Sequence, residues 1–105
     1  MKITEFGAKY WQSGTKGSRG TSPLDFDLAT ADTLIEAKKR NLFFLEGNQL
    51  NTFVESLIKH RDVAKEVAGK KYLFISGETL PETLKQKLTE QNIDFIEILL
   101  NQKGT

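Results

Sequence analysis

The chain has 105 residues and a formal net charge of +1 at pH 7, which fits a single domain over residues 1–105 with one hydrophobic core. This charge excludes a strongly basic nucleic-acid binder, so any contact with nucleic acid must come from local clusters of basic residues. The lack of cysteine excludes disulfides and thiolate zinc sites, the single histidine excludes a multi-histidine metal site within the chain, and no apolar run has transmembrane length.

The first segment, residues 2–12, is predicted to form a short amphipathic helix. Ile3, Phe6 and Tyr10 recur at the helical spacings of three and four, although the glycine between them weakens the middle of the segment. Glu5 would lie on this helix, and a solvated position near the helix N-terminus explains an acid there without any further role.

A flexible loop is predicted next, over residues 13–21, because glycine, serine and threonine dominate S-G-T-K-G-S-R-G-T. The spacing of its glycines and lysine is not that of a Walker phosphate-binding loop. Lys16 and Arg19 make the loop basic, which suits contact with a phosphate backbone as well as it suits the solvation of a linker.

The segment 22–40, S-P-L-D-F-D-L-A-T-A-D-T-L-I-E-A-K-K-R, is predicted to form two strands joined by a tight turn at T-A-D-T. Side chains alternate along a strand, so Glu36 and Lys38 share one face of the second strand. Asp25 and Asp27 share a face of the first strand, and the turn would bring that face against the second strand. Two carboxylates and an ammonium group would then converge.

This cluster has a chemical use. Two carboxylates can hold a Mg²⁺-type ion, which keeps some of its waters and also binds a substrate phosphate. The ion polarises a phosphodiester and lowers the pKa of a bound water, while a neighbouring lysine can orient that water or offset charge on the phosphorus oxygens. The alternative is an exposed hairpin with a cross-strand ion pair, since Glu-x-Lys is a common sequence.

The succession of Asp27, then Glu36-Ala37-Lys38, then a long helix beginning near Gln49 resembles the PD-(D/E)xK, or restriction-endonuclease-like, nucleases. The resemblance covers most of the chain. Within this superfamily the run F-D-L-A-T-A-D-T-L-I-E-A-K, which follows T-S, looks most like the small C-terminal toxin domains of bacterial contact-dependent growth inhibition proteins. The sequence departs from the family pattern in having no proline directly before Asp27.

The resemblance implies a divalent metal ion held by Asp27 and Glu36, with Mg²⁺ as the expected ion and Mn²⁺ or Zn²⁺ as alternatives. Lys38 would assist the nucleophile or the transition state. Asp25 stays open as an alternative to Asp27 for the role of the first acid, because only the strand register separates the two.

Further site residues follow from the same resemblance. Gln49, in the first turn of the long helix, would point toward the metal site, and with Phe53 it echoes a Q-x-x-x-aromatic pattern; capping or exposure explains it equally well. Glu5 is a candidate auxiliary ligand or water-positioning residue. Four basic residues are candidates for contact with substrate phosphates on their charge alone: Lys16, Arg19, Lys39 and Arg40. Solvation of a linker, for the first two, and of a strand end, for the last two, explains them as well.

A loop over residues 41–47 contains the apolar run L-F-F-L, which is expected to close the core. The longest helix is predicted over residues 48–68, where apolar residues recur at the helical repeat, and Gly69 is a suitable stop. His60 lies on the polar flank of this helix and is interpreted as an ordinary surface histidine.

The remaining elements are predicted as a buried strand at 71–76, a helix within 77–91 and a strand at 93–99, with parallel pairing of the two strands. The predicted fold class is α/β (an α+β mixed sheet between helices) with a restriction-endonuclease-like core. Its element order is α-β-β-α-β-α-β, with an extra edge strand near 19–22.

The sequence and the resemblance together predict a metal-dependent endonuclease toxin domain that acts in contact-dependent growth inhibition. tRNA is slightly favoured over DNA as the substrate, because the near-neutral charge argues against broad duplex binding. The resemblance also implies a cognate immunity protein and delivery to the target-cell cytoplasm as part of a larger secreted or surface protein. No membrane partner is expected, since no apolar run has transmembrane length. The alternatives are a DNA-maintenance nuclease, such as a Holliday junction resolvase-like enzyme, and a non-catalytic binding module on the same fold.

Overall fold

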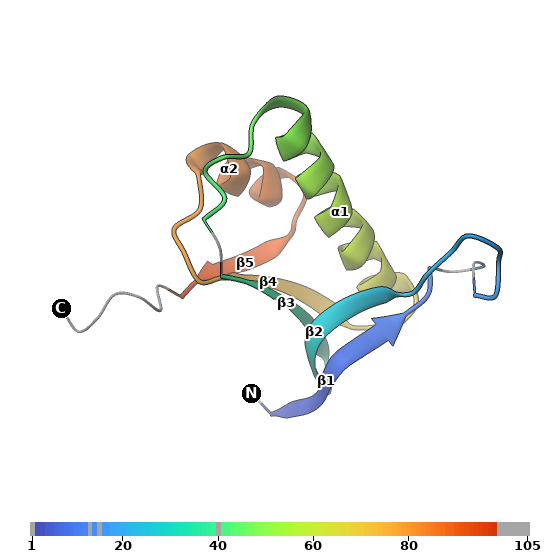
Figure 1. Ribbon diagram of the computed structural model, residues 1–105. Helices are drawn as coiled ribbons and strands as arrows, with labels where there is room; N and C mark the ends of the chain where they lie inside the picture. Colours follow the sequence, from blue (N-terminus) through green and yellow to red (C-terminus); the bar gives the residue numbers. More distant parts are fainter. Residues whose placement is uncertain (1, 13, 15, 40, 99–105) are drawn as a thin grey trace.

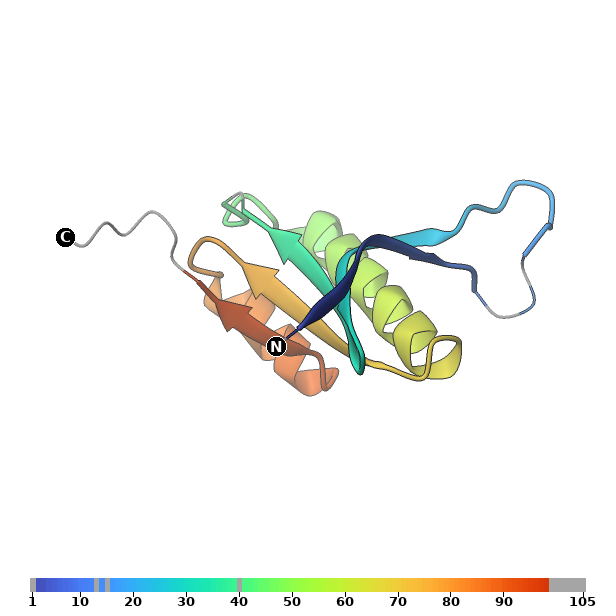
Figure 2. The same cartoon turned by 90° about the horizontal axis from the view of Figure 1, so that it is seen from below.

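The computed structural model describes residues 2–12, 14, 16–39 and 41–98, which form an α+β domain with a five-stranded mixed sheet and two helices. Both helices lie on the same face of the sheet (Figures 1 and 2). The elements in chain order are β1 (Ile3–Tyr10), β2 (Leu24–Thr30), β3 (Thr33–Lys38), α1 (Gly47–Glu66), β4 (Lys71–Ser76), α2 (Glu82–Glu90) and β5 (Asp94–Glu97).

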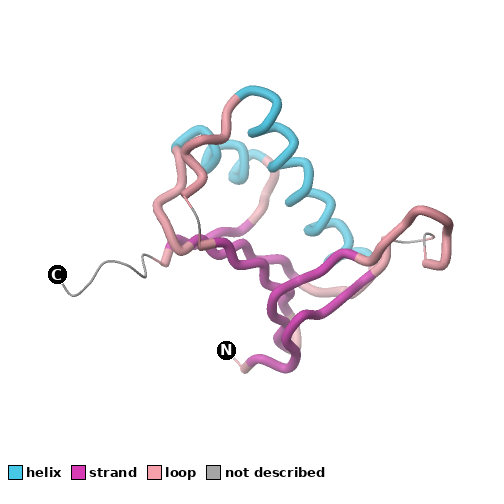
Figure 3. Tube along the Cα trace, in the orientation of Figure 1, coloured by secondary structure: helices cyan, strands magenta, loops and turns pink. Residues whose placement is uncertain are grey.

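The strands stand in the sheet in the same order as in the chain, β1-β2-β3-β4-β5. β1, β2 and β3 are antiparallel neighbours, whereas β3, β4 and β5 are parallel neighbours. Figure 3 shows a helix between the two strands of each parallel pair. Parallel neighbours need a long crossover, and α1 and α2 supply the two crossovers. The predicted parallel pairing of the last two strands is therefore confirmed.

The core lies between the helices and the sheet. Phe26, Leu34 and Phe74 are fully buried on the strands. The apolar stripe predicted for the long helix is confirmed, and the buried positions of the two helices are Leu50, Val54, Leu57, Val63, Ala64, Leu84 and Leu88. Neither helix of the described residues combines the length and apolar composition that a membrane span requires.

Glycine and proline set the ends of the helices as the sequence predicts. Gly69 has φ +65°, the left-handed conformation that ends many helices, and the Lys70 amide donates to the Ala64 carbonyl at 2.8 Å. α1 ends at Glu66, slightly earlier than predicted. Pro81 stands immediately before the first residue of α2.

The prediction of a helix over residues 2–12 is wrong, because this segment forms β1. The spacing of its apolar residues matches a helix by coincidence: Phe6 is 75% exposed, whereas Ala8 is fully buried. Gly7 has φ +68°, which a right-handed helix does not allow, and β2 supplies a partner for the backbone along the strand. Glu5 therefore lies on a strand.

Two further expectations about the sheet are also wrong. The sheet does not lie between helices, because both helices cover one face. The extra edge strand near 19–22 is not formed either; those residues make a turn, in which the Thr21 amide donates to the Ser18 carbonyl at 3.2 Å. Glycine and serine favour such turns over pairing at an edge.

The β1–β2 hairpin bends sharply where it joins the rest of the sheet (Figure 1). Phe26 and Ala29 are both fully buried in the same core, although strict alternation would put residues three apart on opposite faces. The strand thus changes face between them, at Asp27 and Leu28. Gly7 occupies the corresponding part of β1, where its left-handed backbone allows the bend.

Candidate functional site

The strands β2 and β3 separate at the bend and form a fork. Their backbone pairing includes Leu28 opposite Ile35, and in the described residues it does not continue to the next position. The side chain of Asp27 replaces the missing backbone acceptor: its Oδ2 accepts the Ala37 amide hydrogen at 2.8 Å. The fork therefore has a carboxylate at its root.

The fork brings Asp27, Glu36 and Lys38 together. Extending the register by one residue puts Asp27 opposite Glu36, and Lys38 follows two residues later on the same face of β3. The charges of Asp27 and Lys38 both act on the Glu36 carboxylate. The three side chains therefore share one small region, as the strand alternation predicts.

Glu36 is an acid in a buried setting, with a side chain that is 13% exposed. Burial is the main cause that raises the pKa of Glu36 above its ordinary value, and the charge of Asp27 raises it further. His60, Lys38 and the Tyr72 hydroxyl act in the opposite direction. An arriving cation would remove this repulsion between the two acids.

Tyr72 and His60 hold one oxygen of Glu36. The Tyr72 hydroxyl donates to Oε1 at 3.2 Å, and His60 Nε2 lies 3.5 Å from the same oxygen. Burial and the neighbouring acid raise the pKa of Tyr72 far above its usual range, so its hydroxyl stays a donor. His60 Nδ1 lies 2.8 Å from the Ser56 carbonyl, which assigns a hydrogen to Nδ1, and its ring packs edge-on against Phe26.

Each of the two acids thus has one anchored oxygen and one that is left for a ligand. Asp27 uses Oδ2 for the Ala37 amide, and Glu36 uses Oε1 for Tyr72 and His60. In the described residues, no hydrogen bond or ion pair involves Asp27 Oδ1 or Glu36 Oε2. Anchoring of this kind orients carboxylates before a metal ion binds.

Two carboxylates alone are a small donor set, and the described part of the chain holds no group of three or more His, Cys, Asp or Glu that could bind a metal ion. Mg²⁺ is often bound by one or two carboxylates, with water and substrate phosphate completing its octahedron. The donors present therefore fit this class of ion, with Asp27 and Glu36 as its protein ligands.

Asp25 is placed differently from Asp27. It lies on the distal part of the hairpin and forms an ion pair with Lys9 of β1 at 2.5 Å, and both side chains are well exposed. Of the two acids that the sequence leaves open, Asp27 is the one beside Glu36.

The structure does not bring Gln49 or Glu5 to the two acids. Gln49 is exposed and lines a shallow apolar cavity of about 480 Å³ beside Phe53, on the same side of α1 as His60. Eleven residues separate Gln49 from His60, roughly 16 Å along a helix. Glu5 lies on β1, where it pairs with Ala29 of β2, and its side chain is exposed. Within the described residues, neither Gln49 nor Glu5 has a hydrogen bond or ion pair with the acids.

The four basic candidates for phosphate contact lie in two places. Lys16 and Arg19 are exposed in the loop between β1 and β2. Lys39 is exposed just after β3, close to Gly77. Arg40 lies outside the described residues.

His60 and Tyr72 are the site residues that sequence reasoning missed. The interpretation of His60 as a surface residue is wrong, since its side chain is only 14% exposed. A signal was present: His60 follows the buried Leu57 by three residues and precedes the buried Ala64 by four, which places it beside the apolar stripe. Tyr72 reads as a core strand residue, and only its hydroxyl distinguishes it from Phe74.

No protein-family model, no curated protein and no solved structure matches the chain. The chemistry of the site therefore rests on the geometry of its own residues.

Proposed function

We propose that this chain is a metal-dependent endonuclease of the restriction-endonuclease-like class, which hydrolyses phosphodiester bonds in nucleic acid. The observation that supports this proposal is the fork between β2 and β3, where Asp27 and Glu36, beside Lys38, each have one carboxylate oxygen without a hydrogen-bond or ion-pair partner among the described residues. The proposal is also supported by the element order from β2 onward, in which two antiparallel strands are followed by two helix-linked parallel strands.

The residues of the fork would have different roles in the reaction. Asp27 Oδ1 and Glu36 Oε2 would hold Mg²⁺, Mn²⁺ or Zn²⁺, which when bound polarises the phosphodiester and lowers the pKa of an attached water. Lys38 would donate to the phosphate oxygens on which charge develops. Tyr72 and His60 keep the Glu36 carboxylate in one orientation.

The proposed biological role is the one implied by the resemblance of the sequence to the toxin domains of contact-dependent growth inhibition proteins. The domain would act as a growth-inhibition toxin, delivered as part of a larger protein into the target-cell cytoplasm, and a cognate immunity protein would cover the fork. tRNA leads DNA as the substrate, because a net charge of +1 gives little general attraction to a duplex.

Digestion of plasmid DNA and total tRNA, with Mg²⁺ or with EDTA, tests the proposal. We expect the wild type to cut one of the two substrates only with the metal. Glu36→Gln and Lys38→Ala should each lower the rate by about 10²-fold or more, as expected when a group that stabilises the transition state is removed. The matched controls are Glu55→Gln and Lys59→Ala at exposed positions of α1, and both should cut at the wild-type rate.

Persistent cleavage by both Glu36→Gln and Lys38→Ala would contradict the assignment of the site. If the wild type cuts neither substrate with any divalent metal, the domain is a non-catalytic binding module instead.

A further inference from the structure

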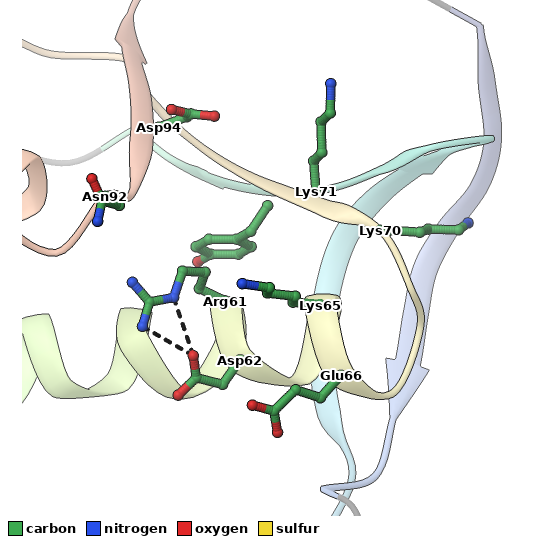
Figure 4. A pocket seen from close by; sticks show the side chains of 9 residues that line it. Arg61, Asp62, Lys65, Glu66, Lys70, Lys71, Asn92 and Asp94 are labelled. Carbon is green, nitrogen blue, oxygen red and sulfur yellow. Dashed lines mark hydrogen bonds and ion pairs between the residues drawn. The ribbon is translucent and has the colours of Figure 1, made fainter.

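A cavity of about 510 Å³ opens beside the last turns of α1, on the side away from the fork (Figure 4). The start of β4 and the turn before β5 form its other walls. Tyr72 lines this cavity, while its hydroxyl donates to Glu36 in the fork, so this side chain has contacts in both places. The cavity has no part in the chemistry proposed for the fork.

Arg61 is fixed at one wall of the cavity. Its Nε and Nη2 donate to Asp62 Oδ1 at 3.1 and 3.0 Å, and its Nη1 donates to the Gln91 carbonyl. A guanidinium has five N–H groups, so two of them are left after these three bonds. A cation that is held in place while keeping free donors is prepared for an oxyanion.

Lys65 adds a second positive charge, one helical turn after Arg61. Figure 4 shows its ammonium group extended toward Arg61 rather than outward. In the described residues Lys65 has neither a hydrogen bond nor an ion pair with any acid. Like charges four residues apart on a helix repel each other, and the Asp62 carboxylate offsets this repulsion only at Arg61, so an anion between the two cations would stabilise their convergence further.

The other charged residues of the wall limit what the cavity can bind. The Lys70 ammonium is occupied by the Thr30 carbonyl at 2.9 Å, and Figure 4 shows Lys71 pointing away from Arg61. Glu66 and Asp94 also line the cavity, and their negative charges disfavour a second anionic group. The cavity therefore suits one compact anion beside α1, and Asn92 on the rim offers it a neutral amide.

We propose that this cavity binds a single phosphate group through Arg61 and Lys65. Guanidinium and ammonium groups are the usual partners of phosphate oxygens in proteins. The phosphate comes either from a nucleic-acid backbone or from a free phosphate or phosphate ester. This inference goes beyond the proposed function and does not depend on cleavage.

Titration of the metal-free protein with inorganic phosphate, followed by amide chemical shifts, tests the site. We expect the largest shifts at Arg61, Lys65 and Asn92. Lys65→Gln should weaken phosphate binding about tenfold, the loss expected for one charge-assisted hydrogen bond. The control is Lys59→Gln, which makes the same charge change on the same helix but outside the cavity, and it should bind as the wild type does.

Equal weakening by Lys59→Gln and Lys65→Gln, or an absence of shifts at the cavity, would overturn the proposal. Binding of a single-stranded oligoribonucleotide in EDTA at several salt concentrations identifies the source of the phosphate. If the site takes a backbone phosphate, Lys65→Gln lowers the slope of log K against log salt concentration by about 0.7. An unchanged slope, with inorganic phosphate binding still weakened, assigns the site to a free phosphate or a phosphate ester.

Discussion

A charged Glu36 is unfavourable for the stability of the fold, although the proposed metal binding requires it. Its side chain is largely buried and lies beside the charge of Asp27, and both effects raise its pKa. The Tyr72 hydroxyl compensates in part by donating to Oε1, and His60, whose Nε2 lies 3.5 Å from the same oxygen, also lowers the pKa of Glu36. Natural proteins commonly tolerate such unfavourable groups where a ligand later relieves them.

Glu36→Gln is expected to raise the stability of the metal-free protein at neutral pH. Below the ordinary pKa of glutamate, near 4.5, Glu36 is protonated and resembles glutamine, so the two proteins should be similar. Between this pH and the raised pKa of folded Glu36, the folded wild type keeps a proton that the unfolded chain has lost. The free energy of unfolding of the wild type therefore falls as the pH rises through the raised pKa. Glu36→Gln has no carboxyl group at this position, so its free energy of unfolding should not fall in this way. Thermal unfolding of both proteins in EDTA across this pH range measures the difference in stability.

Glu55→Gln is the control for this prediction, because it removes a glutamate charge from an exposed position of α1. It should show no comparable gain. A wild type that stays more stable than Glu36→Gln at neutral pH would mean that His60 and Tyr72 compensate fully for the buried charge.

The convergence of Asp27, Glu36 and Lys38 can be predicted from the sequence because strand alternation and a tight turn are local properties. The choice of Asp27 over Asp25 needs the register, which the sequence leaves open. The contacts of His60 cannot be predicted in this way, since they depend on how α1 docks over β3 and β4. A helical period shows which side of a helix is buried, but it does not show which strand residues the helix meets.

Among the elements, the strand at 71–76 and the turn between β2 and β3 form where the sequence predicts them, because the residues that specify them are neighbours in the chain. The Thr30 hydroxyl accepts the Thr33 amide hydrogen at 3.0 Å and donates to Asp32 Oδ1 at 3.1 Å, which is typical turn chemistry. β1 was missed because its stability comes from β2, a partner distant in sequence, and because its apolar residues mimic a helical period.

The bend of the β1–β2 hairpin should depend on the backbone of Gly7. Gly7 has φ +68°, and a Cβ atom added there would meet nothing within 4 Å, so only backbone strain opposes a substitution. Gly7→Ala should cost about 1–2 kcal/mol in the free energy of unfolding. Gly7→Asn should cost less, because asparagine tolerates the left-handed region better than alanine does. Urea denaturation measures both values, and an Ala variant as stable as wild type would mean that the bend tolerates a right-handed backbone here.

At the scale of the whole molecule, the helices leave one face of the sheet without a helical cover. Ile35 and Ile96 both point to this face by their register, yet Ile35 is 1% exposed and Ile96 is 44% exposed. Figure 2 shows β1 crossing this face on the side of β3, which accounts for the difference. The sequence reads as a sheet between helices because apolar residues on both faces of β4 are typical of that arrangement.

The same substitution on this face should therefore have opposite outcomes. Ile96→Lys should change the free energy of unfolding by no more than about 0.5 kcal/mol, as is usual for surface positions. Ile35→Lys would bury an unpaired ammonium group and should prevent folding. Circular dichroism and urea denaturation measure both; a folded Ile35→Lys protein would show that β1 does not seal the face.

The order of the strands has a consequence for how quickly the domain can refold. Every strand hydrogen-bonds to the strand that precedes it in the chain, but only β2 and β3 are joined by a tight turn, whereas a helix lies between the two strands of each parallel pair. Short loops cost little entropy to close, and folding rates rise as contacts become more local. Asp27 and Ala37 are ten positions apart, so the root of the fork can assemble within one hairpin. We therefore expect the root of the fork to form early when the domain refolds.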